Sequence, residues 1–393
     1  MKLPHTFTKQ AIIRRSVRID DNAGSADFPY NNTGRPLMKL LRWALCFLLA
    51  LTLLVAIALQ FAPDIEPWPI APEVPPAKPG EVSLTFLGTS TLLITDGKTH
   101  LLTDGYFSRV SIPRLFTPIS PNRERIDEAL ALAGIDALDA IPVLHSHFDH
   151  VMDSGIVAQI TGAQVLGSSS TAMVARGSGL EEKRITTVQT HHPYRFGDFT
   201  LYFVPAGHVP LPGIIENWTG KGEITEPVTP PSLLGAWEEG QSYGLVVEHP
   251  AGTILIQGSA GMQPGELDRY QADYALLASA SLGKQSEAYQ QAFMDETASA
   301  VGAHTVIPVH WDDFFRKLEP DVRPLPWMLD NLDASFHALA DRHHGDFVVL
   351  KPFRPFTLTP PAAPATAPLP QGQSPVSPAP AAPPPGASDG ANN

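Results

Sequence analysis

The chain has almost no cysteine, since Cys46 is the only one among its 393 residues. One cysteine cannot form a disulfide within the chain, so a fold held together by disulfides is excluded. Outside position 46 the chain also lacks a thiol nucleophile and a thiolate metal ligand. Any metal site elsewhere in the chain must therefore use histidine and carboxylate side chains.

Positive charge is scarce as well. The chain carries 27 Lys and Arg against 40 Asp and Glu, a formal net charge of −13 at pH 7. Nucleic-acid binding depends largely on neutralising phosphates with Lys and Arg, so this balance argues against a nucleic-acid partner. The exception is the N-terminal segment 1–42, which has eight Lys and Arg and three Asp and Glu.

A run of 19 residues without a charged side chain follows that basic segment, at 43–61. It is long enough to cross a bilayer. Because basic flanks stay in the cytoplasm, we expect a membrane anchor with 1–42 inside and the rest of the chain exported to the periplasm or beyond. The alternative is a signal peptide cleaved near Ala56-Ile57-Ala58, which would release a secreted periplasmic form. A signal of this kind would begin at Met38 and make residues 1–37 an upstream extension.

Eighteen of the 40 prolines gather in two places. Seven of them predict a semi-rigid, proline-rich linker over 62–80. Eleven more lie among Ala, Ser and Gly near the C-terminus, and this composition predicts a disordered tail over 357–393. The remaining segment, 81–356, is long enough to bury the core of one domain.

Within 81–356, β-rich runs come first in hairpins and then alternate with helical patterns, of which 123–133 and 285–301 are examples. This order favours an α/β domain with two sheets between helices. Segment 210–241 interrupts the pattern with two Trp and several Pro and Gly. A segment of this length indicates either a loop that covers the functional site or a flexible decoration.

The most informative motif is His145-Ser146-His147-Phe148-Asp149-His150, directly after the apolar run 140–144. The run predicts a buried strand, and at a strand end His145 and His147 point the same way. Asp149 and His150 follow as the chain turns. Neutral imidazoles and carboxylates are the ligands that zinc and similar divalent metals take in proteins, so the motif predicts a metal site.

This motif resembles that of the metallo-β-lactamase-fold hydrolases, and three further pieces follow in the family's order over about 81–356. The pieces are Leu101-Leu102-Thr103-Asp104-Gly105, Val204-Pro205-Ala206-Gly207-His208 and Ile307-Pro308-Val309-His310. The resemblance implies a four-layer αββα sandwich, here preceded by one transmembrane helix. The early Phe86-Leu87-Gly88-Thr89-Ser90 and the Ile-Pro-x-His ending are similar to the branch that includes phospholipase-D-type lipid hydrolases and sugar-phosphate lactonases.

The resemblance also implies roles. One zinc ion would take His145, His147 and His208 and keep an open position for water, and a second would take Asp149, His150 and His310. With one metal, Asp149 would instead orient the water or accept its proton. Asp104 would accept a hydrogen bond from the outer nitrogen of a metal histidine. No motif surrounds the other histidines considered: His100, His191, His192, His249 and His304.

One position departs from the family's pattern. Ser259 stands where the family has an Asp that bridges two metals. A hydroxyl is a poorer ligand than a carboxylate for a divalent cation, so either the second site is weak or another carboxylate substitutes. The candidates are Asp153, Asp312 and Asp313, which could equally be ordinary turn or cap residues.

Two functions fit these expectations. The first is an exported, membrane-anchored zinc hydrolase that cleaves an ester-like bond (phosphodiester, lactone or carboxylester) in a small-molecule or lipid-like substrate. The second is a membrane-anchored binding or scaffolding module with a degraded metal site, which Ser259 supports. The zinc content of the purified protein distinguishes the two.

Overall fold

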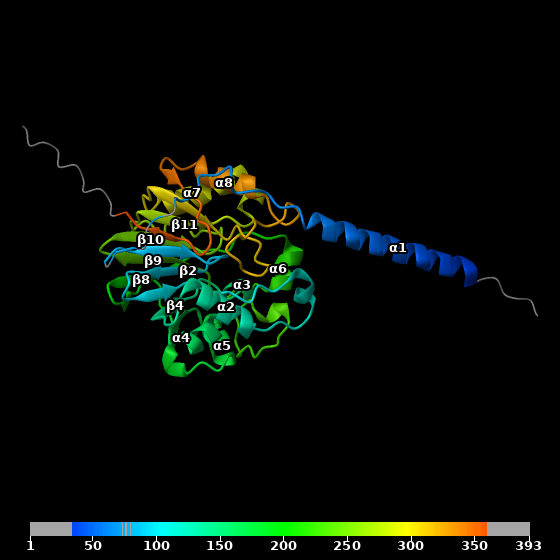
Figure 1. Cartoon of the computed structure of the whole chain (residues 1–393), viewed down its shortest axis with the longest axis horizontal. Helices are drawn as coiled ribbons and strands as arrows, with labels where there is room; N and C mark the ends of the chain where they lie inside the picture. Colours follow the sequence, from blue (N-terminus) through cyan, green and yellow to red (C-terminus); the bar gives the residue numbers. More distant parts are fainter. Residues whose placement is uncertain (1–33, 73, 75–76, 79, 360–393) are drawn as a thin grey trace, which may run out of the picture. The chain divides into compact units, whose positions relative to one another are not determined.

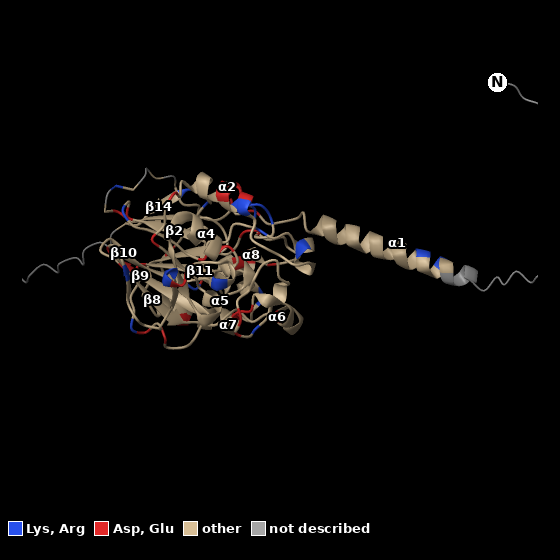
Figure 2. Cartoon of the chain, turned by 90° about the horizontal axis from the view of Figure 1, so that it is seen from below, with Lys and Arg blue, Asp and Glu red and all other residues tan. Residues whose placement is uncertain are grey.

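The structure, a computed structural model, describes residues 34–72, 74, 77–78 and 80–359 and divides the chain into two units, 1–57 and 58–393. Helix α1 (Gly34–Ala58) makes up the described part of the first unit. Its segment Met38–Ala58 has a mean hydropathy of 2.4, and Figure 2 shows Lys and Arg only near its beginning. By length and composition this helix is a candidate membrane span.

The described part of the second unit contains two seven-stranded mixed sheets. The first has the order β14 (Pro355–Thr357), β1 (Ser83–Phe86), β2 (Leu92–Thr95), β3 (His100–Leu102), β4 (Ala140–Pro142), β5 (Gln164–Gly167) and β6 (Ile185–Thr187). The second has the order β13 (Asp346–Phe347), β12 (Thr305–Val309), β11 (Tyr274–Ala278), β10 (Gly252–Gln257), β9 (Tyr243–His249), β8 (Phe199–Pro205) and β7 (Tyr194–Phe196). The helices of this unit are α2 (Arg123–Ala133), α3 (Phe148–Val151), α4 (Ser154–Thr161), α5 (Ser169–Gly177), α6 (Gly213–Thr219), α7 (Glu287–Met294) and α8 (Leu332–Ala340).

Three buried apolar clusters separate four layers. One lies between the sheets and joins side chains of β1 and β10, such as Leu84 and Ile256. A second packs α2 and α4 on the first sheet, and a third packs α7 and α8 on the second. Figure 1 shows helices on both outer faces of the paired sheets. The predicted α/β class and the αββα layering, preceded by one apolar helix, are therefore confirmed.

The strand directions bring the expected site residues to one edge. Strands β3 and β4 run parallel, so the residues after them emerge together, and Asp104 N–H donates to Pro142 O at 3.0 Å. Strand β8 is antiparallel to β9, which is antiparallel to β10, and β10 to β12 run parallel. The ends of β8 and β12, which precede His208 and His310, therefore lie at the same edge of the second sheet.

Several local predictions can be compared with the observed elements. Helix 123–133 matches α2, which Asn122 caps by accepting from Arg125 N–H and which Gly134 ends in the left-handed conformation. The predicted helix 285–301 is divided, because Ser286 caps α7 at Glu287 and a π turn, Asp295–Ser299, follows α7. The segment 210–241 is not an irregular loop throughout, since it contains α6 and the 3₁₀ turn η3 (Leu234–Ala236).

Residues at both predicted boundaries of the domain pack on it. In the predicted linker, Ile65 belongs to the core between the sheets, the Trp68 ring lies 5.2 Å from that of Phe336, and Ile70 pairs with Val349. At the other end, Leu358 is buried. Part of the predicted linker therefore contacts the domain, and the tail predicted from 357 lies outside the described residues from 360 onward.

Candidate metal centre

The histidine motif turns from a strand into a helix at the shared edge of the sheets. After β4, Leu144 N–H donates to Asp104 Oδ1 at 2.8 Å, which fixes the strand end beside the loop that follows β3. His147 has an extended backbone and precedes α3 directly. Because α3 begins at once, Asp149 and His150 lie in its first turn, within reach of the space that His145 and His147 face.

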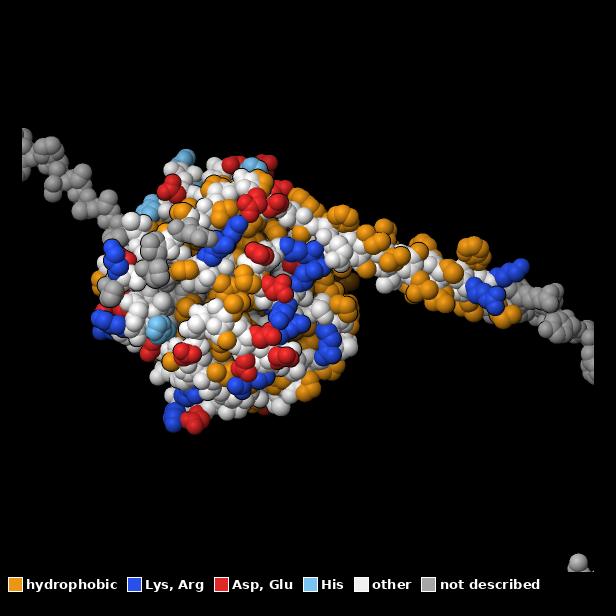
Figure 3. Space-filling view, viewed as in Figure 1, with side chains coloured by type: hydrophobic (Ala, Val, Ile, Leu, Met, Phe, Trp, Pro, Cys, Tyr) orange, Lys and Arg blue, Asp and Glu red, His pale blue; other side chains and the backbone are white. Residues whose placement is uncertain are grey.

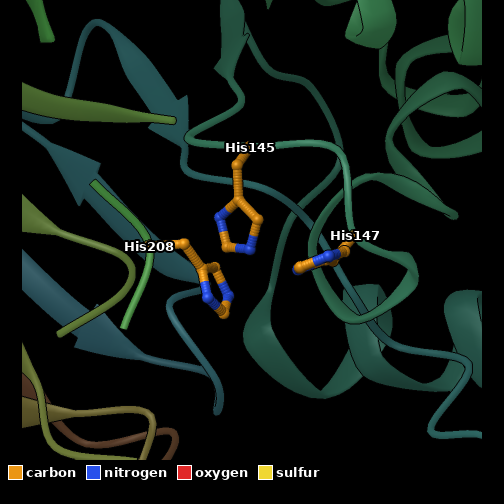
Figure 4. A group of neighbouring side chains, drawn as sticks. All are labelled: His145, His147 and His208. Carbon is orange, nitrogen blue, oxygen red and sulfur yellow. The ribbon is translucent and has the colours of Figure 1, made fainter. Parts of the chain in front are cut away.

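The first group of candidate ligands is His145, His147 and His208. One ring nitrogen of each lies within 4.8 Å of the corresponding nitrogens of the other two. The ring centroids are 5.0 Å apart for His145 and His147 and 4.8 Å apart for His147 and His208. Figure 4 shows the three rings around a common space, with His208 entering from the second sheet. The tertiary fold thus unites residues that are about 60 positions apart in the sequence.

Hydrogen bonds fix which nitrogen is free in two of the three rings. His147 Nε2 donates to Gly220 O at 3.1 Å and His208 Nδ1 donates to Val209 O at 2.9 Å, because a carbonyl oxygen can only accept. The lone pairs are then on His147 Nδ1 and His208 Nε2. His145 Nε2 is buried and has no hydrogen-bond partner. Neutral imidazoles with a free ring nitrogen are the ligands that a divalent cation takes, so this group could hold one.

The second group is Asp149, His150 and His310, whose ligand atoms also lie within 4.8 Å of one another. Asp149 Oδ2 is 3.4 Å from His310 Nε2 and 3.9 Å from His150 Nε2. The rings of His145 and His150 are 3.8 Å apart, so the two groups are contiguous. This arrangement could hold a second cation beside the first.

Asp104 orients one ring of the second group, that of His150. His150 Nδ1 donates to its Oδ2 at 2.8 Å, and Ser90 Oγ donates to the same oxygen at 2.5 Å. With Nδ1 engaged, His150 presents the lone pair of Nε2 to the site. Asp104 and His310 both adopt positive φ, 56° and 58°, a conformation that costs energy and is found mainly at functional sites.

Burial and neighbouring charges shift the pKa values of these groups in different directions. Desolvation lowers the pKa of His145 and His147 and brings that of His208 down to about 3. Burial also opposes charge on His150, but Asp104 and Asp149 outweigh it and raise the pKa of His150. Burial acts to raise the pKa of Asp149, yet His150 and His310 hold it well below its usual value, so Asp149 is ionised at neutral pH.

These shifts predict that acid removes metal from the two groups in order. Protons compete with a cation for the same lone pair, so the ligand with the higher pKa is lost at the higher pH. We expect the Asp149, His150 and His310 group to release its ion first as pH falls, and the first group to do so at a lower pH. In buffer with enough zinc to fill a loosely held second group as well, the zinc bound per chain, measured by elemental analysis, should fall in two steps between pH 8 and pH 4, and His150→Ala should abolish the one at higher pH. A single joint step would contradict this order.

The three candidate replacements for the missing bridging Asp are engaged elsewhere. Asp153 accepts from Phe107 N–H and from both the N–H and the hydroxyl of Ser108, and burial raises its pKa to about 6. Asp312 pairs with Arg109, and Asp313 pairs with Arg316 and Arg323. None of the three belongs to either group, and Ser259 Oγ accepts from Val209 N–H at 3.0 Å.

Of the histidines without a motif, only His249 joins a further cluster in the described residues, with Asp96 and Asp198. Its Nδ1 accepts from Ala251 N–H at 3.1 Å, so the neutral ring carries its proton on Nε2, which lies 3.7 Å from Asp96 Oδ2. A protonated nitrogen has no lone pair to give, and the cluster therefore does not form a ligand set of the kind seen at the first two groups.

Segment 210–241 contacts the histidine motif at two points. Gly220, which caps α6, provides the carbonyl for His147, and Glu239 O accepts from Ser146 N–H at 2.9 Å. These contacts, like that of Ser90 with Asp104, were not predicted, because no local sequence signal marks a carbonyl or hydroxyl that meets a distant histidine or carboxylate.

No family model matches the chain, and no curated protein does. Solved structures resemble it at low identity. The metallo-β-lactamase fold protein YhfI from Bacillus subtilis is 15% identical, with 71% of this chain and 99% of YhfI covered and a TM-score of 0.45. The metallo hydrolase Igni18 from Ignicoccus hospitalis is 13% identical, with 70% and 98% covered and a TM-score of 0.42.

CmlA, a diiron β-hydroxylase from Streptomyces venezuelae, is also similar, at 13% identity, with 72% of this chain and 55% of CmlA covered and a TM-score of 0.43. Likenesses this distant carry no information about the reaction of this chain. The two sheets between helical layers, with the histidine motif at their shared edge, give the chain the four-layer αββα arrangement that its motifs predicted.

Proposed function

We propose that this protein is a metal-dependent hydrolase that uses zinc to cleave an ester-like bond with water. The observation that supports this most strongly is the orientation of His147, His150 and His208. The outer nitrogen of each ring is engaged by a carbonyl or carboxylate, which leaves the other nitrogen free to face the site. Zinc bound in such a site lowers the pKa of its water to about 7 and polarises the bond to be cleaved.

The residues of the chain divide the remaining work. Asp149 is held in its ionised form, so its carboxylate can accept a hydrogen bond from the attacking water and orient it. Its low pKa makes it a poor store for the proton of that water. Asp104 fixes the ring of His150, and Gly220 fixes that of His147. The bond cleaved is a phosphodiester, lactone or carboxylester, in a small-molecule or lipid-like substrate.

The alternative is a membrane-anchored binding module with a degraded metal site. Ser259 favours it, because a serine at this position leaves Asp149 as the one carboxylate in the two groups of candidate ligands among the described residues. The six converging side chains oppose it. Zinc content separates the two functions: a full-length protein purified gently without chelator should contain zinc if it is an enzyme, and none if the site is degraded.

The proposed reaction is tested with a phosphodiester, a carboxylester and a lactone, each with a chromogenic or pH readout. Activity on at least one should disappear after chelation and return with added zinc. A protein that contains zinc but hydrolyses none of the three bonds would contradict the proposal that it cleaves an ester-like bond. An activity that resists chelation would contradict metal dependence.

Ser259 gives a test of the metal count. Its hydroxyl holds the backbone N–H next to His208, so a carboxylate at this position would point toward the same edge. We expect Ser259→Asp to raise zinc from about one toward two ions per chain, because a carboxylate adds a charged ligand between two cations. Ser259→Ala is the matched control and should not raise it. Two tightly held ions in the unmodified protein would overturn the one-metal interpretation.

We further propose that α1 is a membrane anchor and that the domain is exported. The basic residues before the apolar run support this orientation, and cleavage after Ala58 is the alternative. A reporter fused after Pro79 should be active only on the exported side of the membrane. A cytoplasmic signal would reverse the orientation, while a soluble product that begins near Leu59 would indicate a signal peptide.

A further inference from the structure

Large apolar side chains remain exposed around helix α6. The helix has no buried residue, and Ile214 on it is 83% exposed. Trp218 stacks on the exposed ring of Phe116 with centroids 5.0 Å apart, and Ile119 pairs with Ser232, which places exposed Leu233 beside the same segment. The α6 surface is defined as Phe116, Ile214, Ile215, Trp218 and Leu233. Contiguous apolar patches on a folded surface mark sites for a membrane or another protein.

A second exposed apolar set lies where the chain enters this unit. Trp327 N–H donates to Phe61 O at 3.1 Å, and Arg323 donates to the carbonyls of Leu59 and Gln60 at 2.8 and 2.9 Å. Phe61, Trp327 and Met328 are exposed, and these three residues are called the Trp327 turn. Since Ala58 ends the candidate span, Phe61 is within roughly 11 Å of the end of that span even when the chain is fully extended. A bilayer crossed by α1 must therefore lie close to the Trp327 turn.

Contacts within the unit connect the two sets. Lys284 Nζ donates to Leu329 O, next to Met328, and Gln285 Nε2 donates to Pro210 O at 3.0 Å, shortly before α6 begins. Figures 1 and 2 both place α6 at the end of this unit where the chain enters it, and Figure 3 shows hydrophobic side chains along that edge. The α6 surface and the Trp327 turn thus belong to one end of the unit.

We propose that the α6 surface and the Trp327 turn lie in the interfacial layer of the bilayer that α1 crosses, so that the metal centre opens toward the membrane. The inference rests on the proposed membrane anchor. Tryptophan is favoured at this depth, because its ring is apolar and its N–H needs a polar partner. Two of the neighbouring cations are already paired, Lys221 with Glu216 and Arg316 with Asp313, so apolar contact provides most of the attraction.

The metal centre adjoins helix α6. Helix α6 begins shortly after His208 and ends at Gly220, whose carbonyl accepts from His147 Nε2. Both ends of the helix are therefore connected to candidate ligands, by the chain at one end and by a hydrogen bond at the other. A bilayer in contact with α6 lies beside the first metal group.

The test measures the depth of fluorescent labels on the full chain in phosphatidylcholine vesicles. Cys46, the only cysteine, is exposed and lies within the candidate span, so the unmodified protein provides a label for the span itself. In a Cys46→Ser background, Ile214→Cys labels the α6 surface and Lys98→Cys labels the exposed turn between β2 and β3. That turn precedes β3 and lies at the end of the sheet opposite Asp104, which makes it the matched control.

We expect lipids with a quencher near the headgroup to reduce the fluorescence of the Ile214→Cys label several-fold more than that of the Lys98→Cys label. The Cys46 label should be quenched best by a quencher deep in the acyl chains. Quenching at Cys46 but not at Ile214→Cys would overturn the docking surface and retain the span. Quenching at neither would overturn both. A blue-shifted but unquenched Ile214→Cys label would mean that a protein surface covers α6, which also contradicts the proposal.

Discussion

Replacement of His145 by alanine should lower hydrolytic activity by at least about 100-fold and remove most of the zinc. Loss of a residue that only supports a ligand typically costs 10–100-fold, and we propose His145 as a ligand itself. Its Nε2 is buried without a hydrogen-bond partner, as expected of a nitrogen whose lone pair is free for a metal. Elemental analysis and turnover on the best model ester measure the two effects in the same preparation.

His192→Ala is the matched control, because it removes the same ring from an exposed position. It should leave zinc and turnover within a few-fold of the unmodified protein. If His145→Ala retained turnover within a few-fold as well, the metal centre would be wrongly placed. If it lost turnover but kept its zinc, His145 would act on the substrate rather than on the metal.

Replacement of Asp312 by alanine should cost about 3–5 kcal/mol of unfolding free energy. Asp312 and Arg109 form an ion pair with no exposed side-chain surface, and removal of one partner leaves an uncompensated buried charge. Asp312 also accepts from Thr89 N–H at 2.7 Å, while Thr89 O accepts from His310 N–H at 2.7 Å. We therefore expect weaker zinc binding at the second group together with the loss of stability. Denaturation of the full chain in detergent measures the unfolding free energy, and elemental analysis measures the zinc.

Two variants test the cause. Asp268→Ala removes an exposed carboxylate and should change the unfolding free energy by no more than about 0.5 kcal/mol. The double variant Arg109→Met with Asp312→Leu removes both charges and should be more stable than Asp312→Ala alone, since no buried charge remains unpaired. A double variant less stable than Asp312→Ala would show that the neighbouring hydrogen bonds, rather than the unpaired charge, dominate.

The segment 86–90 illustrates how the sequence can signal a feature without revealing its cause. The sequence marks this segment only by its resemblance to a family, whereas in the structure Gly88, Thr89 and Ser90 each support the contacts around the site. A Cβ at Gly88 would lie 1.8 Å from Arg109 Nη2, so glycine is required for the buried ion pair to approach. Ser90 donates to Asp104, and the Thr89 backbone connects Asp312 with His310.

The ester-like substrate, the zinc and the export of the domain remain proposals from the sequence that the experiments above can test. The sequence by itself determined the features that depend on local order. The apolar run 140–144 with His145 to His150 predicted a strand end with metal ligands, because side-chain alternation and the turn that follows act over a few residues. The composition of 43–61 predicted a candidate span, since apolar length alone makes a helix able to cross a bilayer.

Only the tertiary structure decided which distant groups meet. Packing of the two sheets brings the ends of β3, β4, β8 and β12 to one edge, so that Gly220 meets His147 and Asp104 meets His150. It also engages Asp153, Asp312 and Asp313 away from the two groups, although their sequence positions made them equal candidates. The physical reason is that hydrogen bonds and ion pairs select partners by distance and geometry in the folded state, which spacing along the chain does not encode.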